Sequence, residues 1–311
     1  MPKGKTQKSL DFINACFQIL EEIQPASVRA VAYQLFVRRL LPDMSKSNTN
    51  QVSKQLVYAR EHEIVPWDWI VDETREEERV AVWQNLSSCL QAIQEGYRRD
   101  FWVNQPVRVG VWSEKGTVRG TLSPVLDTYQ VPFLPIHGHN SATITRRTAQ
   151  YERYDRRHWV VLYVGDFDPS GMDMSERDLP ERLQRYGATD TFRIIRLAIE
   201  ATDLDDMERQ ALTFDSRDKE VEAERRYGPH TKKGKDTRRP WFEANYGRRC
   251  CELDAMNPNE LRRRVELAIL AHIDRDAWNQ MRAIETVECD SFREIRERWD
   301  GLSDGLPPNR L

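Results

Sequence analysis

The sequence predicts an α/β fold that is preceded by a helical N-terminal domain. In the first sixty residues, apolar side chains recur at three- and four-residue steps, as they do in amphipathic helices. From residue 107 onward, β-branched apolar runs alternate with helical stretches, which is typical of a mainly parallel, Rossmann-like sheet. The length of 311 residues favours two domains over one hydrophobic core.

Three short helices are expected in the N-terminal part. The first covers residues 10–23, and the second begins just after Pro25 and ends near Pro42. The third follows N-cap candidates at residues 47–49, and residues 64–69 have the composition of a short strand and turn. This order is typical of a winged helix-turn-helix, whose third helix enters the DNA major groove. Small helical bundles that bind nothing share the same pattern.

The basic side chains of this domain are the first candidates for DNA contact, with Lys46, Lys54 and Arg60 facing the groove or the phosphates. After them, residues 72–99 are predicted to form a long charged helix, although a coiled coil or a solvated face fits equally well. The sequence therefore predicts a winged-helix domain over residues 1–75, a helical linker over 76–103, and an α/β domain with a C-terminal helical extension over 104–311.

Four strands are predicted in the second half of the chain, and the runs at residues 107–112 and 158–164 are expected to be buried. The four strands are expected at residues 107–112, 131–136, 158–164 and 191–197. Helices are expected after Thr117, from Ser141 and over residues 175–186, so that strands and helices alternate. The prediction is therefore a doubly wound sheet, in which ligands gather at the carboxyl ends of the strands.

Acidic side chains fall at two of these strand ends. Glu114 follows the first strand, and Asp166 and Asp168 follow the strand at residues 158–164. In an extended chain the two aspartates point to the same side, where their charges repel unless a cation neutralises them. Mg²⁺ prefers oxygen ligands, so we predict a Mg²⁺ site made of these three carboxylates. Glu114 has a second possible role as a general acid or base, and an isolated Asp-x-Asp pair is often only a helix cap.

Two motifs resemble those of a known family. The segment Gly165-Asp166-Phe167-Asp168-Pro169-Ser170-Gly171 is similar to the aspartate–x–aspartate–proline–x–glycine segment of toprim domains, and Ser113-Glu114-Lys115-Gly116 resembles their glutamate strand end. Within that family the chain resembles the A subunit of type IIB topoisomerases and the related meiotic break-forming protein, in a more compact form. The resemblance extends from about Val28 to Ile269 and implies a winged-helix domain followed by a toprim domain.

The resemblance also implies a nucleophile. In the family a catalytic tyrosine follows an arginine-containing helical motif, which here is similar to residues 29–33, with Arg29 and Tyr33 in the functional positions. The family usually has two adjacent tyrosines, whereas this chain has Ala32 in the first place. Without the resemblance, Tyr33 is interpreted as a half-buried aromatic of the second helix. A further similar segment, residues 251–261, is expected to have a structural role.

A basic run between residues 225 and 249 is the second candidate for DNA contact. It is interleaved with aromatic side chains and includes Lys232, Lys233 and Lys235, which suits a loop along the phosphate backbone. A charge run of this kind is also common on surfaces that are simply solvated. The net charge of −3 argues against a protein that coats nucleic acid through bulk charge.

The leading hypothesis is Mg²⁺-dependent cleavage of double-stranded DNA by a homodimer, through a covalent bond to Tyr33. One alternative is a toprim-type hydrolytic nuclease in which a metal-activated water attacks, and another is a non-catalytic DNA-binding module. The chain has no phosphate-binding loop of the GxxxxGK[ST] form, so strand passage would require a separate GHKL-type ATPase subunit.

Composition and chain start suggest the compartment. The first residues lack the apolar core of a signal peptide, and no run approaches the roughly eighteen apolar residues of a membrane span. The five cysteines include no CxxC pair, so neither a disulfide framework nor a zinc site is indicated. We therefore expect a cytoplasmic protein without a membrane partner.

Overall fold

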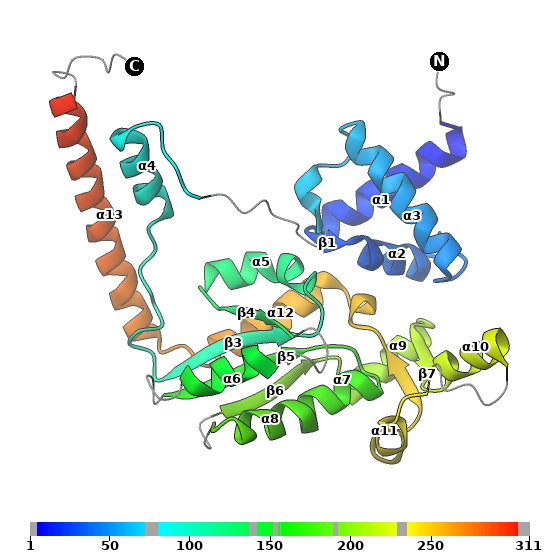
Figure 1. Ribbon diagram of the computed structural model, residues 1–311. Helices are drawn as coiled ribbons and strands as arrows, with labels where there is room; N and C mark the ends of the chain where they lie inside the picture. The colour runs from blue at the N-terminus through cyan, green and yellow to red at the C-terminus, as the bar shows by residue number, and fades with distance from the viewer. Residues whose placement is uncertain are drawn as a thin grey trace. The chain divides into compact units, whose positions relative to one another are not determined.

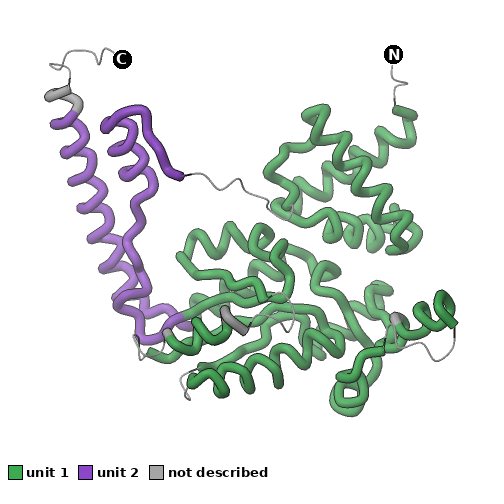
Figure 2. Tube along the Cα trace, viewed as in Figure 1, with its two compact units in different colours: residues 1–74, 109–271 green, residues 75–108, 272–311 purple. Residues whose placement is uncertain are grey.

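The chain forms two compact units, coloured separately in Figure 2. Unit 1 consists of residues 1–74 and 109–271, and unit 2 of residues 75–108 and 272–311. This computed structural model describes residues 5–71, 80–136, 142–151, 155, 157–188, 192–228 and 235–303. Unit 1 holds both the N-terminal helices and the sheet, so every contact of the candidate site described below lies within one unit. The division at 1–75, 76–103 and 104–311 stays a prediction.

The three predicted N-terminal helices are present. They are α1 (Gln7–Ile23), α2 (Val28–Val37) and α3 (Lys46–Glu61). The Ser27 hydroxyl accepts a hydrogen bond from the backbone N–H of Ala30, which fixes the start of α2. The third helix begins earlier than expected because Ser45, and not one of residues 47–49, is its N-cap. Their apolar faces meet in one hydrophobic core, which includes the buried side chains of Leu20 and Leu35.

The expected strand and turn at residues 64–69 is wrong. The segment forms the short 3-10 helix η1 (Trp67–Trp69), and the strand β2 (Ile70–Val71) follows it. The composition of this segment suggested a strand, but its aromatic rings contact helices: the Arg60 guanidinium of α3 lies 4.8 Å from the centre of the Trp67 ring, and the ring centres of Trp69 and Phe17 of α1 are 5.3 Å apart. The two-residue strand β2 pairs in parallel with β1 (Ala26–Ser27), and residues 5–71 contain no antiparallel hairpin.

The α/β prediction with a parallel-strand sheet is confirmed. The four strands are β3 (Val107–Ser113), β4 (Phe133–Pro135), β5 (His158–Val164) and β6 (Phe192–Ala198). Their order is β4-β3-β5-β6, with β4 parallel to β3 and β6 parallel to β5. Figure 1 shows α5 (Val118–Thr128) and α12 (Pro258–Leu270) on one face, and α6 (Ala142–Tyr151) and α8 (Leu179–Arg185) on the other.

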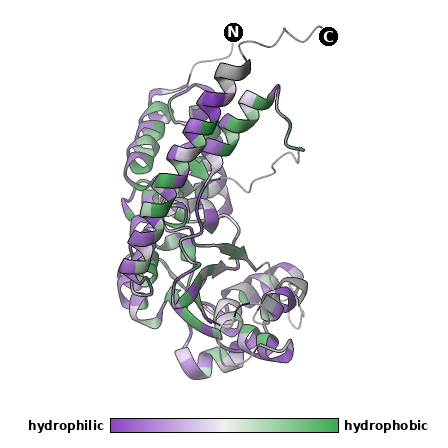
Figure 3. Ribbon diagram, turned by 90° about the vertical axis from the view of Figure 1, so that its left-hand side faces the viewer, coloured by the Kyte–Doolittle hydropathy of each residue, from purple (hydrophilic) through white to green (hydrophobic). Residues whose placement is uncertain are grey.

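The core of unit 1 follows from this layering. Strand β5 is central and its residues from Val160 to Val164 are all buried, because helices cover both faces of the sheet. On one face, Trp112 and Tyr163 pack with Leu183 of α8. Figure 3 shows the strands coloured mostly as hydrophobic, whereas the helices carry alternating hydrophilic and hydrophobic stripes.

The helix after β5 begins earlier than predicted. It runs through α7 (Pro169–Asp173), the π-helical turn η3 (Met174–Asp178) and α8, where residues 175–186 were expected. Asp168 caps the first turn and Pro169 occupies the first helical position, where its missing N–H is not needed. The helix therefore starts directly at the Asp-x-Asp segment.

The chain beyond β6 contains elements that were not predicted. They are η4 (Ala201–Asp203), α9 (Leu204–Arg209), β7 (Thr213–Asp215), α10 (Asp218–Tyr227), α11 (Arg239–Tyr246), β8 (Arg249–Cys251) and η5 (Leu253–Ala255). Strands β7 and β8 form an antiparallel pair. After β8 the chain continues through η5 into α12, and Cys251 of β8 also pairs with Phe167 of the Asp-x-Asp segment.

Unit 2 is built on two helices, α4 (Leu86–Gly96) and α13 (Arg275–Ser303). The Tyr97 hydroxyl donates a 2.6 Å hydrogen bond to Glu288, which links the end of α4 to α13. A helix was predicted over residues 72–99. Within residues 80–99 it is shorter, because Asn85 forms a capping box that starts α4 and Tyr97 is extended, and residues 72–79 lie outside the described residues. Across the described parts of the chain, no helix is long and apolar enough to span a bilayer.

Candidate active site

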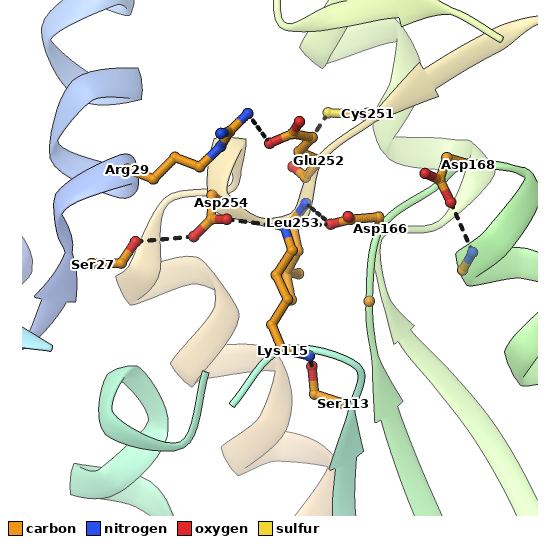
Figure 4. Close-up of polar contacts among 12 residues, drawn as sticks. Ser27, Arg29, Ser113, Lys115, Asp166, Asp168, Cys251, Glu252, Leu253 and Asp254 are labelled. Atoms are coloured by element: carbon orange, nitrogen blue, oxygen red, sulfur yellow. Dashed lines mark hydrogen bonds and ion pairs between the residues drawn. The ribbon is translucent and has the colours of Figure 1, made fainter. Parts of the chain in front are cut away.

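The candidate site lies where three segments of unit 1 meet, at the ends of β3 and β5 and at the turn from β8 into η5 (Figure 4). Phe167 and Cys251 exchange two backbone hydrogen bonds of 2.8 and 2.9 Å. This small bridge holds the β8 turn against the Asp-x-Asp segment, although the two are more than eighty residues apart in the chain. The carboxyl ends of neighbouring strands are where α/β folds bind their ligands.

A lysine holds two carboxylates together at the centre of the site. The Lys115 ammonium lies 2.9 Å from the Oδ1 atom of Asp166 and 2.9 Å from the Oδ2 atom of Asp254. Burial alone would lower the pKa of Lys115, but the charges of Asp254 and Asp166 outweigh it and raise this pKa. The lysine therefore stays charged, and carboxylates from two distant segments pair with the same ammonium group.

Both carboxylates are fixed by a second hydrogen bond. The backbone N–H of Leu253 donates a 2.7 Å bond to the Oδ1 atom of Asp166, and the Ser27 hydroxyl donates a 3.0 Å bond to the Oδ1 atom of Asp254. Ser27 is also the N-cap of α2, so the same side chain ties the helical N-terminal region to the site. The positions of the acids are set before any ligand arrives.

The three predicted acids follow the ends of β3 and β5. Burial raises the pKa of Tyr163, the charge of Arg196 lowers it, and the charges of Glu114, Asp166 and Asp168 raise it. Asp168 is buried and accepts a 2.8 Å bond from the N–H of Gly171, so the helix-cap role is present. Among the residues that the structure describes, no three acidic, histidine or cysteine side chains form a ready-made metal cage.

Arg196 on β6 forms hydrogen bonds to the backbone of the Asp-x-Asp turn. The Arg196 guanidinium donates to the carbonyl oxygens of Gly165, Asp166, Gly171 and Ile199 and to the Ser175 hydroxyl. One side chain thus holds the backbone before, within and after the Asp-x-Asp segment. This arrangement orients Asp166 and α7 relative to β6.

Tyr33 and Arg29 reach the same turn from α2. The Arg29 guanidinium forms an ion pair with Glu252 and lies 5.8 Å from the centre of the Tyr33 ring. Tyr33 is only 6% exposed, and burial together with the Glu252 carboxylate raises its pKa, an effect that Arg29 partly offsets. The structure therefore places Tyr33 next to the turn that carries Glu252.

The predicted DNA contacts differ in exposure. Lys46 and Lys54 are exposed on α3, whereas Arg60 is buried and its guanidinium lies 4.8 Å from the centre of the Trp67 ring. Arg60 packs within the domain, so it does not present its charge to a groove. Lys235 is exposed, with its ammonium 3.9 Å from a Glu220 oxygen. Lys232 and Lys233 lie outside the described residues.

Several site residues were not identified from the sequence: Ser27, Lys115, Arg196, Glu252 and Asp254. The segment 251–261 was expected to have a structural role, but it supplies two carboxylates to the site. One signal was available, because Glu252 and Asp254 follow a short strand with the same two-residue spacing as Asp166 and Asp168.

No family model matches this chain, and no curated protein matches it either. Function is therefore inferred from the site and from the motifs that form it.

Replacing Lys115 with methionine tests whether the ammonium holds the site together. With Asp166 and Asp254 left facing each other in EDTA-containing buffer, we expect the free energy of unfolding to fall by about 1–3 kcal/mol, because a partly buried charge loses its partner. Denaturant unfolding measures this change. Lys8→Met, at an exposed position of α1, is the control. Equal stability of the two variants would contradict a role for Lys115 in holding the acids.

Proposed function

We propose that this chain cleaves DNA phosphodiester bonds with the help of a divalent cation bound at Glu114, Asp166 and Asp168. The observation that carries the proposal is the meeting of Asp166 and Asp254, which come from separate segments, at the Lys115 ammonium, beside the strand ends that carry Glu114 and Asp168. In this interpretation, the sheet of unit 1 is a toprim domain and the N-terminal helices are a variant of a winged helix-turn-helix.

The side chains present fit a hard cation. Every acid of the cluster offers carboxylate oxygen, which is the ligand type that Mg²⁺ prefers. When bound there, Mg²⁺ supplies positive charge that stabilises the phosphate oxygens during the reaction. The ammonium of Lys115 and the guanidinium of Arg29 are the protein's own cations at the site, and both suit contacts with phosphate oxygens.

Tyr33 is the first candidate for the attacking group. Its helix α2 packs against η5, which brings the phenol ring beside Arg29 and Glu252. Attack of the phenol oxygen on phosphorus would form a phosphotyrosine ester and release the 3′ oxygen of the other DNA segment. The protein would then remain attached to a 5′ DNA end, and the reverse reaction would reseal the strand. This chemistry is that of the type IIB topoisomerase A subunits that the motifs resemble.

Hydrolysis by water is the second candidate, and one observation favours it. Tyr33 is almost completely buried and its pKa is raised, so forming the phenolate is costly and the hydroxyl has little access to DNA. A water molecule can reach the phosphate from solvent, and a divalent cation at the acidic cluster would lower the pKa of such a water. In this case the chain would be a hydrolytic nuclease, and Tyr33 would only help to pack α2.

The proposed partners follow from the resemblance and from exposed charge. Double-stranded DNA would contact Lys46 and Lys54 of α3 and the basic segment that contains Lys235. A homodimer is proposed from the resemblance alone: the tyrosine and the metal site of the related enzymes come from different subunits, whereas here Tyr33 lies beside the site of its own chain. A separate GHKL-type ATPase subunit would be needed for strand passage but not for cleavage.

Cleavage of supercoiled plasmid with Mg²⁺ tests the function and distinguishes the two mechanisms. Wild type, Tyr33→Phe and Asp166→Ala are compared on denaturing gels with and without protease, with Tyr58→Phe on α3 as the matched tyrosine control. For transesterification we expect protein bound to 5′ DNA ends in wild type and Tyr58→Phe only. Cleavage that is insensitive to protease, survives Tyr33→Phe and is lost in Asp166→Ala identifies hydrolysis. Cleavage that persists in Asp166→Ala would contradict the proposed site.

A further inference from the structure

The cation ligand Asp166 of the proposed site is already paired with a cation of the protein. Its Oδ1 atom lies 2.9 Å from the Lys115 ammonium and accepts a 2.7 Å hydrogen bond from the backbone N–H of Leu253. A carboxylate oxygen has about two lone pairs, so both are engaged at this atom. A divalent cation that binds either oxygen of Asp166 would lie close to the ammonium, and the two positive charges would repel each other.

Of these two donors, the ammonium is the one that can withdraw. The Leu253 N–H belongs to the backbone, and the hydrogen bonds between Phe167 and Cys251 hold that backbone against the Asp-x-Asp segment. Lys115 instead carries its charge at the end of a flexible side chain. A cation that enters at Asp166 therefore displaces Lys115 rather than Leu253.

Asp254 lies where it can keep the displaced ammonium (Figure 4). Its Oδ2 atom is 2.9 Å from the same Nζ atom, and its Oδ1 atom accepts a 3.0 Å hydrogen bond from the Ser27 hydroxyl. Only 28% of the Lys115 side chain and 15% of the Asp254 side chain are exposed, so solvent screens their ion pair weakly. This pair can persist when the pair with Asp166 is broken.

The charges of the site agree with this arrangement. One ammonium between two carboxylates leaves one negative charge unbalanced, which favours the arrival of a second cation. Without the Asp254 carboxylate, Lys115 and Asp166 would form a neutral pair that an incoming cation has to break. Asp254 thus weakens the hold of Lys115 on Asp166.

We propose that Asp254 is a positioning residue of the cation site, which takes over the Lys115 ammonium when a divalent cation binds Asp166. This inference rests on the proposed function, because it requires a cation at Asp166. Asp254 does not bind the cation itself: it draws a competing charge away from Asp166 and keeps that charge at the site. Lys115 thereby remains available to contact a phosphate oxygen of DNA.

Binding of Mn²⁺, used as a probe for Mg²⁺, tests this inference by titration calorimetry. The proteins compared are wild type, Asp254→Asn, Lys115→Met and the variant with both substitutions. We expect Asp254→Asn to weaken Mn²⁺ binding by about tenfold or more, because Lys115 then pairs with Asp166 alone. In the Lys115→Met background, the loss caused by Asp254→Asn should be smaller by about fivefold or more, because no ammonium competes with Mn²⁺.

Two further variants serve as controls. Asp127→Asn removes an exposed carboxylate from α5 of the same unit and should leave Mn²⁺ affinity unchanged. Ser27→Ala loosens Asp254 without removing any charge, and it should weaken Mn²⁺ binding in the wild-type background but not in the Lys115→Met background. If melting in EDTA shows that Asp254→Asn is unfolded, this second pair of proteins replaces it.

The outcomes separate this inference from the proposed function. Equal losses of affinity in the two backgrounds would show that Asp254 acts on the cation directly, which overturns the transfer of Lys115 while the cation site stands. Unchanged affinity in Asp254→Asn would overturn it as well. If wild type binds no Mn²⁺, the cation site and the role of Asp254 fail together, whereas Mn²⁺ binding without DNA cleavage would contradict the proposed function alone.

Discussion

Replacing Asp166 with asparagine is expected to reduce DNA cleavage by about a thousandfold or more, because charge stabilisation at the reacting phosphate would be lost. Asparagine has nearly the same size, but its amide is neutral. It cannot balance the Lys115 ammonium, and it offers a bound cation one neutral oxygen where two charged ones stood. The rate of plasmid cleavage under saturating Mg²⁺ measures the effect.

The matched control for this variant is Asp127→Asn. Asp127 lies on α5 of the same unit, where its exposed carboxylate pairs with Arg119 at the surface. We expect this variant to cleave DNA at the wild-type rate, since surface ion pairs contribute little. Retention of most activity by Asp166→Asn would rule out the acidic cluster as the reaction centre.

Replacing Gly171 with alanine is expected to disrupt both the stability and the activity of the protein. A Cβ atom at this position would overlap the carbonyl oxygen of Asp166, which is backbone and cannot rotate away. Both residues are also held by Arg196, so relief would require α7 to move from the Asp-x-Asp turn. We expect the free energy of unfolding to fall by about 3 kcal/mol, at the upper end for overpacking, and cleavage to fall with it.

Denaturant unfolding and plasmid cleavage measure this prediction, with Gly96→Ala as the control. Gly96 ends α4, and a Cβ atom added there would meet no atom within 4 Å. Alanine at this position should leave stability unchanged or slightly higher, because it restricts the unfolded chain. Equal behaviour of the two variants would show that the Asp-x-Asp turn tolerates displacement of α7.

Periodicity was enough to predict the sheet. The run at residues 159–164 is apolar, as is typical of a strand that is covered on both faces. The prediction that Glu114, Asp166 and Asp168 follow the ends of two strands also holds, since they come directly after β3 and β5. Local pattern therefore placed these acids on the chain relative to the strands, and their role stays a prediction.

The remainder of the site could not be predicted, because it depends on contacts between distant segments. The spacing of Glu252 and Asp254 after a strand does not show that Asp254 meets Lys115, because their contact joins segments that are far apart in the chain and are held together by the bridge between Cys251 and Phe167. The strand predicted at residues 64–69 is absent for a similar reason, because Trp67 contacts α3 and Trp69 contacts α1, and the local sequence does not indicate these contacts. The contact with Trp67 also helps to bury Arg60, which was predicted to face DNA.

The bridge between Phe167 and Cys251 has a consequence for the order of events during synthesis. A growing chain that has emerged only as far as β6 contains both strand ends and their acids, yet it lacks Asp254 and the Leu253 N–H that hold Lys115 and Asp166. The arrangement becomes complete only after the β7 and β8 pair has emerged from the ribosome and folded back onto the sheet. Nascent or truncated fragments that end before β8 would thus carry an unassembled centre.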